Sequence, residues 1–497
     1  MNKILKTSFW STVIIYFGVV IGFLNSIILF PKYLSTEQIG LIRQLISASY
    51  ILIPVSTLGV SASYVKFYPS FKDNEIKKNQ FFSFQLIVVL ISYSIVCLIL
   101  NFFFYEIKDL FTDKSDLFFQ YFNLLYIILF FMVISTLFES YLRARYDTIL
   151  SNYINGVSNR ILTAFSILFL ANSLIDFNTL INLQVIIYLI GILILIIYSN
   201  RLDKISIKIR FNSIKKSINK ILKFNSFSSI GAFSNILVMN VDVLMVTSIL
   251  GLAETGIYTT AFYIGMIIEI PRRAISQISI PFISENINNK RYDKIEKNYK
   301  DVSLHQMIIG ALFLLLIIVN LDDIYSLIPN SENFISGKNV VLIIGISKLI
   351  QMSFSYNSEL ISLSKYYKFT VITVFILAFF TISLNIILIP ELGMIGAAYS
   401  SLISILIFNI VKFMFIKKKM NLSPFSTKSV LILILSLGLF YLSNFIPDIE
   451  NNFINIIIKS FIITLLYISL ILIFNVSEYI NIEFSKILKK LNLTKNL

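Results

Sequence analysis

The sequence is poor in the residues from which catalytic and metal sites are built. It contains one cysteine, one histidine and one tryptophan in 497 residues. The single cysteine, Cys97, excludes a disulfide within the chain and any cysteine-rich metal site. The single histidine, His305, cannot form a metal cluster or a catalytic triad by itself, and we expect it to be an ordinary helix-end residue. Charged residues make up only 14% of the chain, whereas soluble domains contain about a quarter, so a soluble globular protein is excluded.

Apolar residues are abundant and come in long runs. They form 57% of the chain, and the mean hydropathy is +0.81. The runs are about 18 to 25 residues long, which is the length that crosses a bilayer as a helix; one extends from Phe81 to Phe104. The alternating segments of about 10 residues that are typical of a membrane barrel are absent, which leaves helices. The predicted fold class is an all-α polytopic membrane protein.

We expect about fourteen membrane-spanning helices. Their predicted ranges are 9–30, 41–65, 81–104, 118–138, 150–171, 180–199, 224–249, 256–280, 303–320, 339–362, 369–389, 394–416, 429–447 and 453–475. The first run is too long for the apolar core of a signal peptide and lacks a small-residue cleavage site, so we expect it to be retained as a helix.

Lysine and arginine cluster in every second loop. If the N-terminus is cytoplasmic, about 35 of the 42 cations fall on the inner side, where short loops collect such residues. A missed or invented helix would invert this pattern in every later loop, so the pattern supports the count. We predict a bacterial inner (plasma) membrane protein with both termini in the cytoplasm. The net charge of +15 follows from this inward bias, and nucleic acid is not expected as a partner.

Two similar turns indicate an internal repeat. The segment "LSTEQIGLIRQLI" (34–46) resembles "LGLAETGIYTTAF" (250–262), since both carry a leucine and a glutamate, then a glycine followed by an aliphatic run. A polar residue precedes each turn by a similar distance, and a proline follows it. These residues are Asn25 and Asp242 before the turns, and Pro54 and Pro271 after them.

The repeat predicts two lobes of about six helices each, related by a pseudo-twofold axis along the membrane normal, as in transporters with parallel repeats. The predicted divisions are an N-terminal lobe over 1–199, a basic cytoplasmic linker over 200–223, a C-terminal lobe over 224–416, and two further helices with a basic tail over 417–497. Apolar residues at helical spacing in the linker favour an interfacial amphipathic helix, with a flexible linker as the alternative.

Three segments resemble a known family. "NVDVLMVTSILGLAETGIYTTAF" (240–262), "FPKYLSTEQIGLIRQL" (30–45) and "ESYLRARYDTI" (139–149) resemble segments of bacterial polysaccharide-export flippases. These are the O-antigen or capsule (Wzx-type) members of the multidrug/oligosaccharidyl-lipid/polysaccharide (MOP) exporter superfamily. The resemblance implies a 6+6+2 arrangement, and transfer of an undecaprenyl-pyrophosphate-linked oligosaccharide from the inner to the outer leaflet by alternating access. It also implies partners in the bilayer and in the polymerase and glycosyltransferases of the same glycan pathway.

Such a substrate requires a polar, cationic cavity, and ionisable groups within spans are the candidates for its lining. Arg43 could bind phosphate through its guanidinium fork, or it could snorkel to the outer interface. In the tenth span, a stripe on one helix face contains Lys348, Gln351, Ser355 and Glu359, for which burial against another polar helix is the alternative.

Acidic and amide residues supply the candidates for ion coupling and charge pairing. Asp242 in the seventh span is predicted to bind a coupling cation or to pair with Arg43 or Lys348, and its helix also carries Asn235. Sodium, protons and the membrane potential all remain open as the driving force, and no cofactor is expected. Asn25 is the matching polar position in the first span.

The eighth span carries three further charges. Glu269 and Arg273, at i and i+4, are predicted to form an ion pair within the helix. Arg272 points away from that pair and is predicted to reach phosphate from the inner mouth.

Two other readings remain open at the level of sequence. Within the same superfamily, the chain could be a lipid II-type flippase or a cation-coupled multidrug antiporter. In a different class, it could be an integral-membrane polysaccharide polymerase or glycosyltransferase. The outer loops are short and carry no paired carboxylate motif, so we expect a transporter and not an enzyme.

Overall fold

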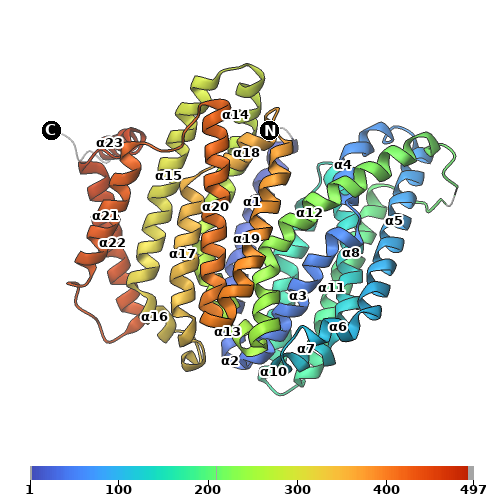
Figure 1. Cartoon of the computed structure of the whole chain (residues 1–497), viewed down its shortest axis with the longest axis horizontal. Coiled ribbons are helices and arrows are strands. Elements are labelled where there is room, and N and C mark those ends of the chain that lie inside the picture. The colour runs from blue at the N-terminus through green and yellow to red at the C-terminus, as the bar shows by residue number, and fades with distance from the viewer. Residues whose placement is uncertain (1–2, 209, 491–497) are drawn as a thin grey trace. The chain divides into compact units, whose positions relative to one another are not determined.

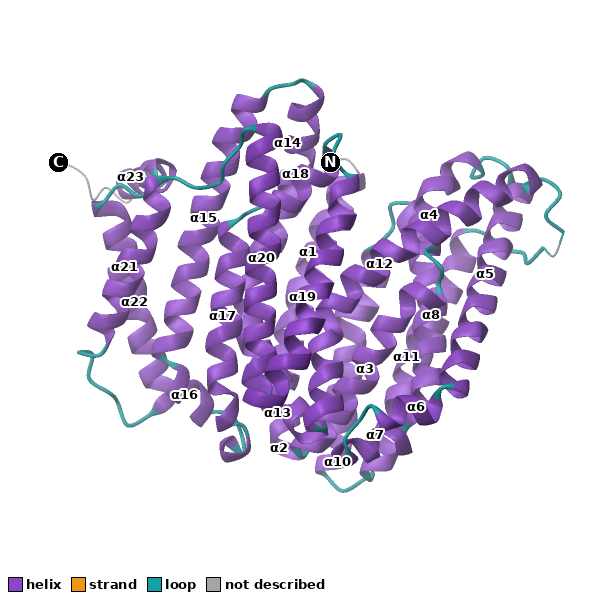
Figure 2. Cartoon of the chain, viewed as in Figure 1, coloured by secondary structure: helices purple, strands orange, loops and turns teal. Residues whose placement is uncertain are grey.

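The computed structural model describes the backbone of residues 3–208 and 210–490. Helices and short connections make up all of this described part (Figures 1 and 2). The side chains that are not described are those of residues 1–9, 209, 235, 273, 274, 276–278, 281, 288 and 487–497. The prediction of an all-α polytopic membrane protein is confirmed.

Eleven helices in the described ranges are long and apolar enough to cross a membrane, or up to 12 if a bent pair, Lys215–Ser234 and Ile236–Leu250, counts as one span. Two predicted spans do not meet this test. The eighth is divided by a 3-10 turn at Ile267–Glu269, and the thirteenth corresponds to an apolar helix of 17 residues, Thr427–Ser443. The count of fourteen therefore stays a prediction.

The chain forms two compact units. The first contains 1–260 and 378–397, and the second contains 261–377 and 398–497. The helices of the first unit are α1 (Lys3–Leu24), η1 (Asn25–Leu29), α2 (Phe30–Tyr33), α3 (Thr36–Ser56), α4 (Val60–Phe67), η2 (Tyr68–Ser70), α5 (Glu75–Phe102), α6 (Phe104–Asp109), η3 (Asp113–Ser115), α7 (Asp116–Gln120), α8 (Phe122–Ala144), α9 (Ile149–Tyr153), η4 (Ile154–Ser158), α10 (Asn159–Ala171), α11 (Phe177–Leu202) and α12 (Lys215–Leu250).

Three helices contribute to both units: α13 (Leu252–Met266), α19 (Lys368–Leu392) and α20 (Met394–Met420). The remaining helices belong to the second unit. They are η5 (Ile267–Glu269), α14 (Ile270–Asn288), α15 (Tyr292–Val319), α16 (Leu321–Ser326), η6 (Ser331–Asn333), η7 (Ile335–Gly337), α17 (Lys338–Ser353), α18 (Asn357–Leu363), α21 (Thr427–Ser443), α22 (Asn452–Ile473) and α23 (Glu478–Lys490).

The two repeated turns lie against each other inside the first unit. A Cβ atom added to Gly40 would come within 3.0 Å of the Leu252 carbonyl oxygen, and one added to Gly256 would come within 3.0 Å of the Thr36 carbonyl oxygen. Thr36 and Leu252 are 216 residues apart, and so are Gly40 and Gly256. Each turn therefore supplies both a glycine and a carbonyl group, and only glycine allows the two backbones to come this close.

Local sequence explains where α3 begins. Ser35 accepts a hydrogen bond from the Gln38 amide through its hydroxyl (3.2 Å), and the Gln38 side chain accepts one from the Ser35 amide (3.0 Å). This reciprocal capping box satisfies two of the amides that a helix start leaves without partners. The start of α3, and with it the position of Gly40, is consequently fixed.

Two glycines of α1 also allow close packing. A Cβ on Gly18 would collide with the backbone of Gly156 in the π-helix η4, and one on Gly22 would collide with the Arg160 guanidinium. The ridge of small residues packs against another helix in the way that membrane helices commonly use.

The segment that joins α11 to α12 is helical only in part. Residues 203–208 and 210–214 form no helix, and helix resumes at Lys215 and continues into the seventh predicted span. The non-helical stretch is held by side chains of α5, because Asn79, Gln80 and Ser83 accept hydrogen bonds from the amides of Ser206 (3.3 Å), Ser213 (3.0 Å) and Lys208 (2.8 Å). Within the predicted linker 200–223 helix thus resumes at Lys215, and the amphipathic, interfacial character of the linker stays a prediction.

In the second unit, α21 and α22 pack on α15. The Tyr467 hydroxyl donates to the Ile308 carbonyl (3.0 Å), and the His305 ring lies 2.9 Å from the Ser477 hydroxyl. His305 is inside α15 and not at a helix end, because this helix begins at Tyr292, well before the predicted span. In the loop before α22, hydrogen bonds from Lys459 and Asn455 hold the pKa of the exposed Asp448 carboxyl below its ordinary value.

Candidate functional site

A buried cluster of charges lies at the junction of η5 and α14 in the second unit. The Glu269 carboxylate is 2.9 Å from the Arg272 guanidinium and 3.0 Å from the Lys348 ammonium, and the Glu269 residue is only 7% exposed. The carboxylate balances one of these two cations, so the trio keeps one net positive charge. Removal of charge from water is expensive, and such a trio is stable only while its members remain paired.

This pairing differs from the prediction. Arg272 does not point away from Glu269 but forms the ion pair with it at i, i+3. Arg273, the predicted i+4 partner, has a side chain outside the described residues. The prediction that Arg272 points away from Glu269 is therefore wrong, whereas the predicted pair of Glu269 and Arg273 stays a prediction.

The predicted polar stripe of the tenth span is interrupted. Helix α17 ends at Ser353, Ser355 has a left-handed backbone (φ 54°), and α18 begins at Asn357. Lys348 and Gln351 are therefore on one helix, whereas Glu359 is on the next. The assumption of one continuous helix face was wrong.

Side chains of α15 stabilise this break. Tyr299 donates a hydrogen bond to the Phe354 carbonyl (3.3 Å), and Ser303 donates one to the Ser353 carbonyl (2.5 Å). These are carbonyl groups that a helix ending at Ser353 no longer pairs. At membrane depth an irregular backbone is tolerated only where protein groups or water satisfy it, and α15 supplies such groups.

The sequence reasoning missed Lys412. This lysine of α20 is 2% exposed, and its ammonium donates to the Ser358 hydroxyl at 2.7 Å. Its position inside the predicted span 394–416 was the available signal. The adjacent Lys417–Lys419 run was interpreted as the cytoplasmic end of that span, and Lys412 was not considered separately.

A second buried polar cluster lies in the first unit, around Asp242 of α12. Its carboxylate accepts hydrogen bonds from the Asn385 amide (2.8 Å) and the Tyr258 hydroxyl (3.2 Å). Asp242 is 6% exposed, and Asn385 is fully buried. Lys348, one of its two predicted partners, is paired with Glu269. The consecutive helices α12 and α13 thus meet the distant helix α19 at this carboxylate.

The predicted residues of the first repeat lie near one another. Arg43 of α3 donates to the Ser26 hydroxyl (2.6 Å), and its guanidinium is 4.9 Å from the centre of the Phe30 ring. Asn25 of η1 is 5% exposed and donates to the Arg160 carbonyl (2.8 Å). The role of Arg43 in phosphate binding stays a prediction. The side chain of Asn235 lies outside the described residues.

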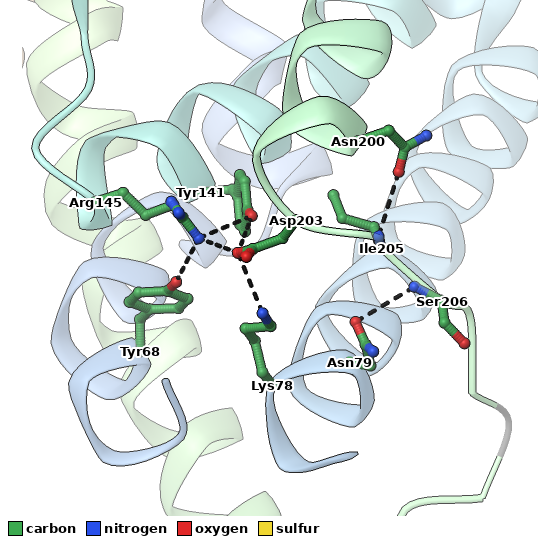
Figure 3. Close-up of polar contacts among 9 residues, drawn as sticks. All are labelled: Tyr68, Lys78, Asn79, Tyr141, Arg145, Asn200, Asp203, Ile205 and Ser206. Carbon is green, nitrogen blue, oxygen red and sulfur yellow. Dashed lines mark hydrogen bonds and ion pairs between the residues drawn. The ribbon is translucent and has the colours of Figure 1, made fainter. Parts of the chain in front are cut away.

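A third cluster, centred on Asp203 at the end of α11, gathers residues of three other helices (Figure 3). The carboxylate contacts the Arg145 guanidinium, accepts a hydrogen bond from the Tyr141 hydroxyl (2.6 Å) and lies 3.2 Å from the Lys78 ammonium. Arg145 in turn donates to the Tyr68 hydroxyl (3.2 Å). One side chain therefore fixes the start of the segment between α11 and α12 on the helical bundle.

Asp203→Asn should loosen that segment. The amide cannot form the ion pairs with Arg145 and Lys78, so we expect trypsin to cleave after the exposed Lys204, Lys208 or Arg210 several times faster in the purified protein. Asp176→Asn, at the other end of α11, is the matched control, because Asp176 only caps the helix through the Thr179 amide. Equal cleavage rates in the two variants would contradict the role assigned to Asp203.

In the part of the chain that the structure describes, no group of three or more histidine, cysteine, aspartate or glutamate residues could hold a metal ion.

A family model described as "Polysaccharide biosynthesis protein" matches residues 4–287, more than half of the chain. The chain belongs to the polysaccharide biosynthesis protein family. No curated protein matches it in sequence.

Solved structures show that this family member has the fold of MOP superfamily transporters. A lipid II flippase, MurJ, in an inward closed conformation is 16% identical, with a TM-score of 0.74 and coverage of 94% of this chain and 99% of that chain. An inward-facing multidrug resistance MATE family transporter of the MOP superfamily is 13% identical, with a TM-score of 0.65 and coverage of 81% and 94%. A MOP superfamily transporter from Pyrococcus furiosus is 14% identical, with a TM-score of 0.56 and coverage of 84% and 95%.

The polysaccharide biosynthesis family member is thus a multi-pass membrane protein whose structural neighbours are flippases and transporters. At these identities the neighbours establish the fold, whereas the substrate depends on the chain's own residues.

Proposed function

We propose that the protein transfers an undecaprenyl-pyrophosphate-linked oligosaccharide, a repeat unit of O-antigen, capsule or exopolysaccharide, from the inner to the outer leaflet of the bacterial plasma membrane. The family and the MOP fold support a lipid-linked flippase. The observation that carries the proposal is the largely buried trio of Glu269, Arg272 and Lys348, which keeps one net positive charge inside a membrane protein.

The physical reason is the charge of the substrate. A diphosphate and a glycan would lose many hydrogen bonds to water in hydrocarbon, at a cost of several kcal/mol for each polar group. A protein lowers that barrier by offering polar and cationic groups in place of water, while the lipid tail stays in the bilayer. Intramembrane cations are costly and are usually retained for such a role.

The proposal includes alternating access in a chain with two six-helix lobes, a C-terminal helix pair and cytoplasmic termini. The reciprocal contact of Gly40 and Gly256 supports the internal repeat. Asp242 remains the candidate for cation coupling, because a carboxylate, an amide and a hydroxyl meet there. Oxygen atoms of such groups suit a hard cation, and Glu359 is the second candidate. The polymerase and glycosyltransferases of the glycan pathway are the proposed partners.

Deleting the gene should abolish the surface glycan while lipid-linked repeat units accumulate on the inner leaflet. The block falls between synthesis on the cytoplasmic side and polymerisation outside, so the units remain inaccessible to a glycan-cleaving enzyme added to spheroplasts and become accessible when the membrane is opened. Measuring the protected fraction of the lipid-linked units, with and without a plasmid copy of the gene, tests the proposal.

Other outcomes separate the alternatives. Lipid-linked units that reach the outer leaflet but stay unpolymerised would favour a polymerase. Accumulation of the peptidoglycan precursor lipid would favour a lipid II-type flippase. A normal glycan with increased drug sensitivity would favour a multidrug antiporter.

A further inference from the structure

Lys412 is a buried lysine that forms no ion pair within the described part of the chain. Its ammonium donates to the Ser358 hydroxyl at 2.7 Å and lies 3.5 Å from the centre of the Phe408 ring. Among the described residues no carboxylate lies within 4.0 Å of it. Two other lysines with little exposure differ in this respect: the partly buried Lys348 is paired with Glu269, and the buried Lys459 is paired with Asp448.

This arrangement is energetically unfavourable for the protein alone. An ammonium has three N–H donors, and only one of them meets an acceptor among the residues described around Lys412. The aromatic ring compensates in part. Burial of an ion costs more free energy in lost hydration than such a contact returns. An anion bound next to Lys412 would neutralise its charge and accept hydrogen bonds from its remaining N–H groups.

Two charged side chains, one on α14 and one on α18, act on Lys412. Arg272 and Glu359 are both close enough to interact electrostatically with Lys412. The Arg272 Nε atom is buried and donates to no acceptor in the described part of the chain, although its Nη1 atom is bound to Glu269. Arg272, Lys348 and Lys412 thus carry one more charge than Glu269 and Glu359 neutralise.

The position of Lys412 is also well defined. Asn409, one turn earlier on α20, accepts a hydrogen bond from Asn357, the residue before Ser358 (3.2 Å). Two contacts therefore join α20 to α18, one between amides and one between Lys412 and the Ser358 hydroxyl. A long side chain that is held in one rotamer loses less entropy when it binds a ligand.

We propose that Lys412, together with Ser358 and Arg272, binds a phosphate group of the transported lipid diphosphate. This inference rests on the proposed function and names a binding site within it. Lysine supplies a point charge, the hydroxyl supplies a further hydrogen bond, and the guanidinium supplies a planar fork suited to phosphate oxygens. Glu269 already occupies one edge of Arg272, so the free edge at Nε is the part that remains for the ligand.

The test measures binding to the purified full-length protein in nanodiscs of zwitterionic lipid. The probes are inorganic pyrophosphate, a polyprenyl diphosphate and phosphatidylglycerol, and the readout is the dissociation constant from isothermal titration. The variant is Lys412→Met, which removes the charge at similar volume and therefore should not destabilise the fold. Lys459→Met is the matched control, because Lys459 is a buried lysine of α22 that already has a carboxylate partner.

We expect Lys412→Met to weaken pyrophosphate and polyprenyl diphosphate binding about tenfold or more, which corresponds to about 1.4 kcal/mol. Ser358→Ala should weaken it less, Lys412→Arg should restore part of it, and Lys459→Met should leave it unchanged. Melting temperatures without ligand, measured for every variant, identify any that misfold.

Three results would overturn the site. They are unchanged diphosphate binding in Lys412→Met, an equal loss in Lys459→Met, and failure of the unmodified protein to bind either diphosphate. A loss confined to phosphatidylglycerol would assign Lys412 to membrane lipid and also overturn the proposal. The proposed function is tested separately by the leaflet assay, so diphosphate binding that survives Lys412→Met in a chain that still flips the lipid rejects this site alone.

Discussion

Gly256→Ala will destabilise the protein, although alanine is the better helix former. The added methyl group would collide with the Thr36 carbonyl, a backbone group that cannot rotate away. Forced overpacking of this kind costs about 1–3 kcal/mol, more than the roughly 1 kcal/mol that glycine-to-alanine replacement gains within a helix. We expect a clearly lower melting temperature for the purified protein, measured by the loss of the monodisperse peak in size-exclusion chromatography after heating.

A second glycine provides a control for which the melting temperature should change in the opposite direction. Gly438 in α21 has no atom within 4 Å of an added Cβ, so Gly438→Ala should raise the melting temperature slightly through the unfolded state. Gly40→Ala should resemble Gly256→Ala, and the double variant should be less than additive, because both changes open the same contact. If Gly256→Ala were as stable as Gly438→Ala, the close approach of the two turns would be contradicted.

Glu269→Gln is expected to have the second large effect. It leaves the partly buried Lys348 and Arg272 with no carboxylate between them, and breaking a fully buried pair from one side costs up to about 3–5 kcal/mol. Lys348→Met in the Glu269→Gln background should recover part of that loss, since one of the two unpaired charges is removed. Thermal unfolding of the four proteins in this double-mutant cycle measures the coupling.

The exposed pair of Glu296 and Lys300 on α15 gives the matched comparison. Both side chains remain accessible, and the median worth of such a pair is about 0–1 kcal/mol, so Glu296→Gln should change the melting temperature little. A double variant Glu269→Gln/Lys348→Met that is less stable than Glu269→Gln alone would show that the two side chains do not balance each other.

Most of the fold could be predicted because hydrophobic length and loop charge are one-dimensional signals. A run such as 81–104 identifies a helix, α5, without any knowledge of its neighbours. The breaks within helices could not be predicted from such signals. The break after Ser353 depends on Tyr299 and Ser303, which lie on another helix and satisfy the freed carbonyls. Pairing between distant segments is not encoded in local periodicity.

For the candidate sites, the sequence likewise identified single residues but not their partners. Lys348, Glu269 and Arg272 could be named because charges inside apolar runs stand out. Their ion pairs could not be predicted, because Glu269 and Lys348 are far apart in sequence. The 3-10 turn before α14 also changes the helical spacing between Glu269 and the arginines that follow it. Asn385, which binds Asp242, is an uncharged amide inside a span and carries no comparable signal.

The contact between Gly40 and Gly256 has the form of a homodimer interface contained in one chain. In a twofold-symmetric dimer, residue i of one subunit contacts residue j of the other, and j contacts i. Here the glycine of each turn meets the carbonyl of the other turn at the equivalent position. Because both halves lie in one chain, the two sides of the contact need not be identical, and they differ where Arg43 in the first turn is matched by Thr259 in the second.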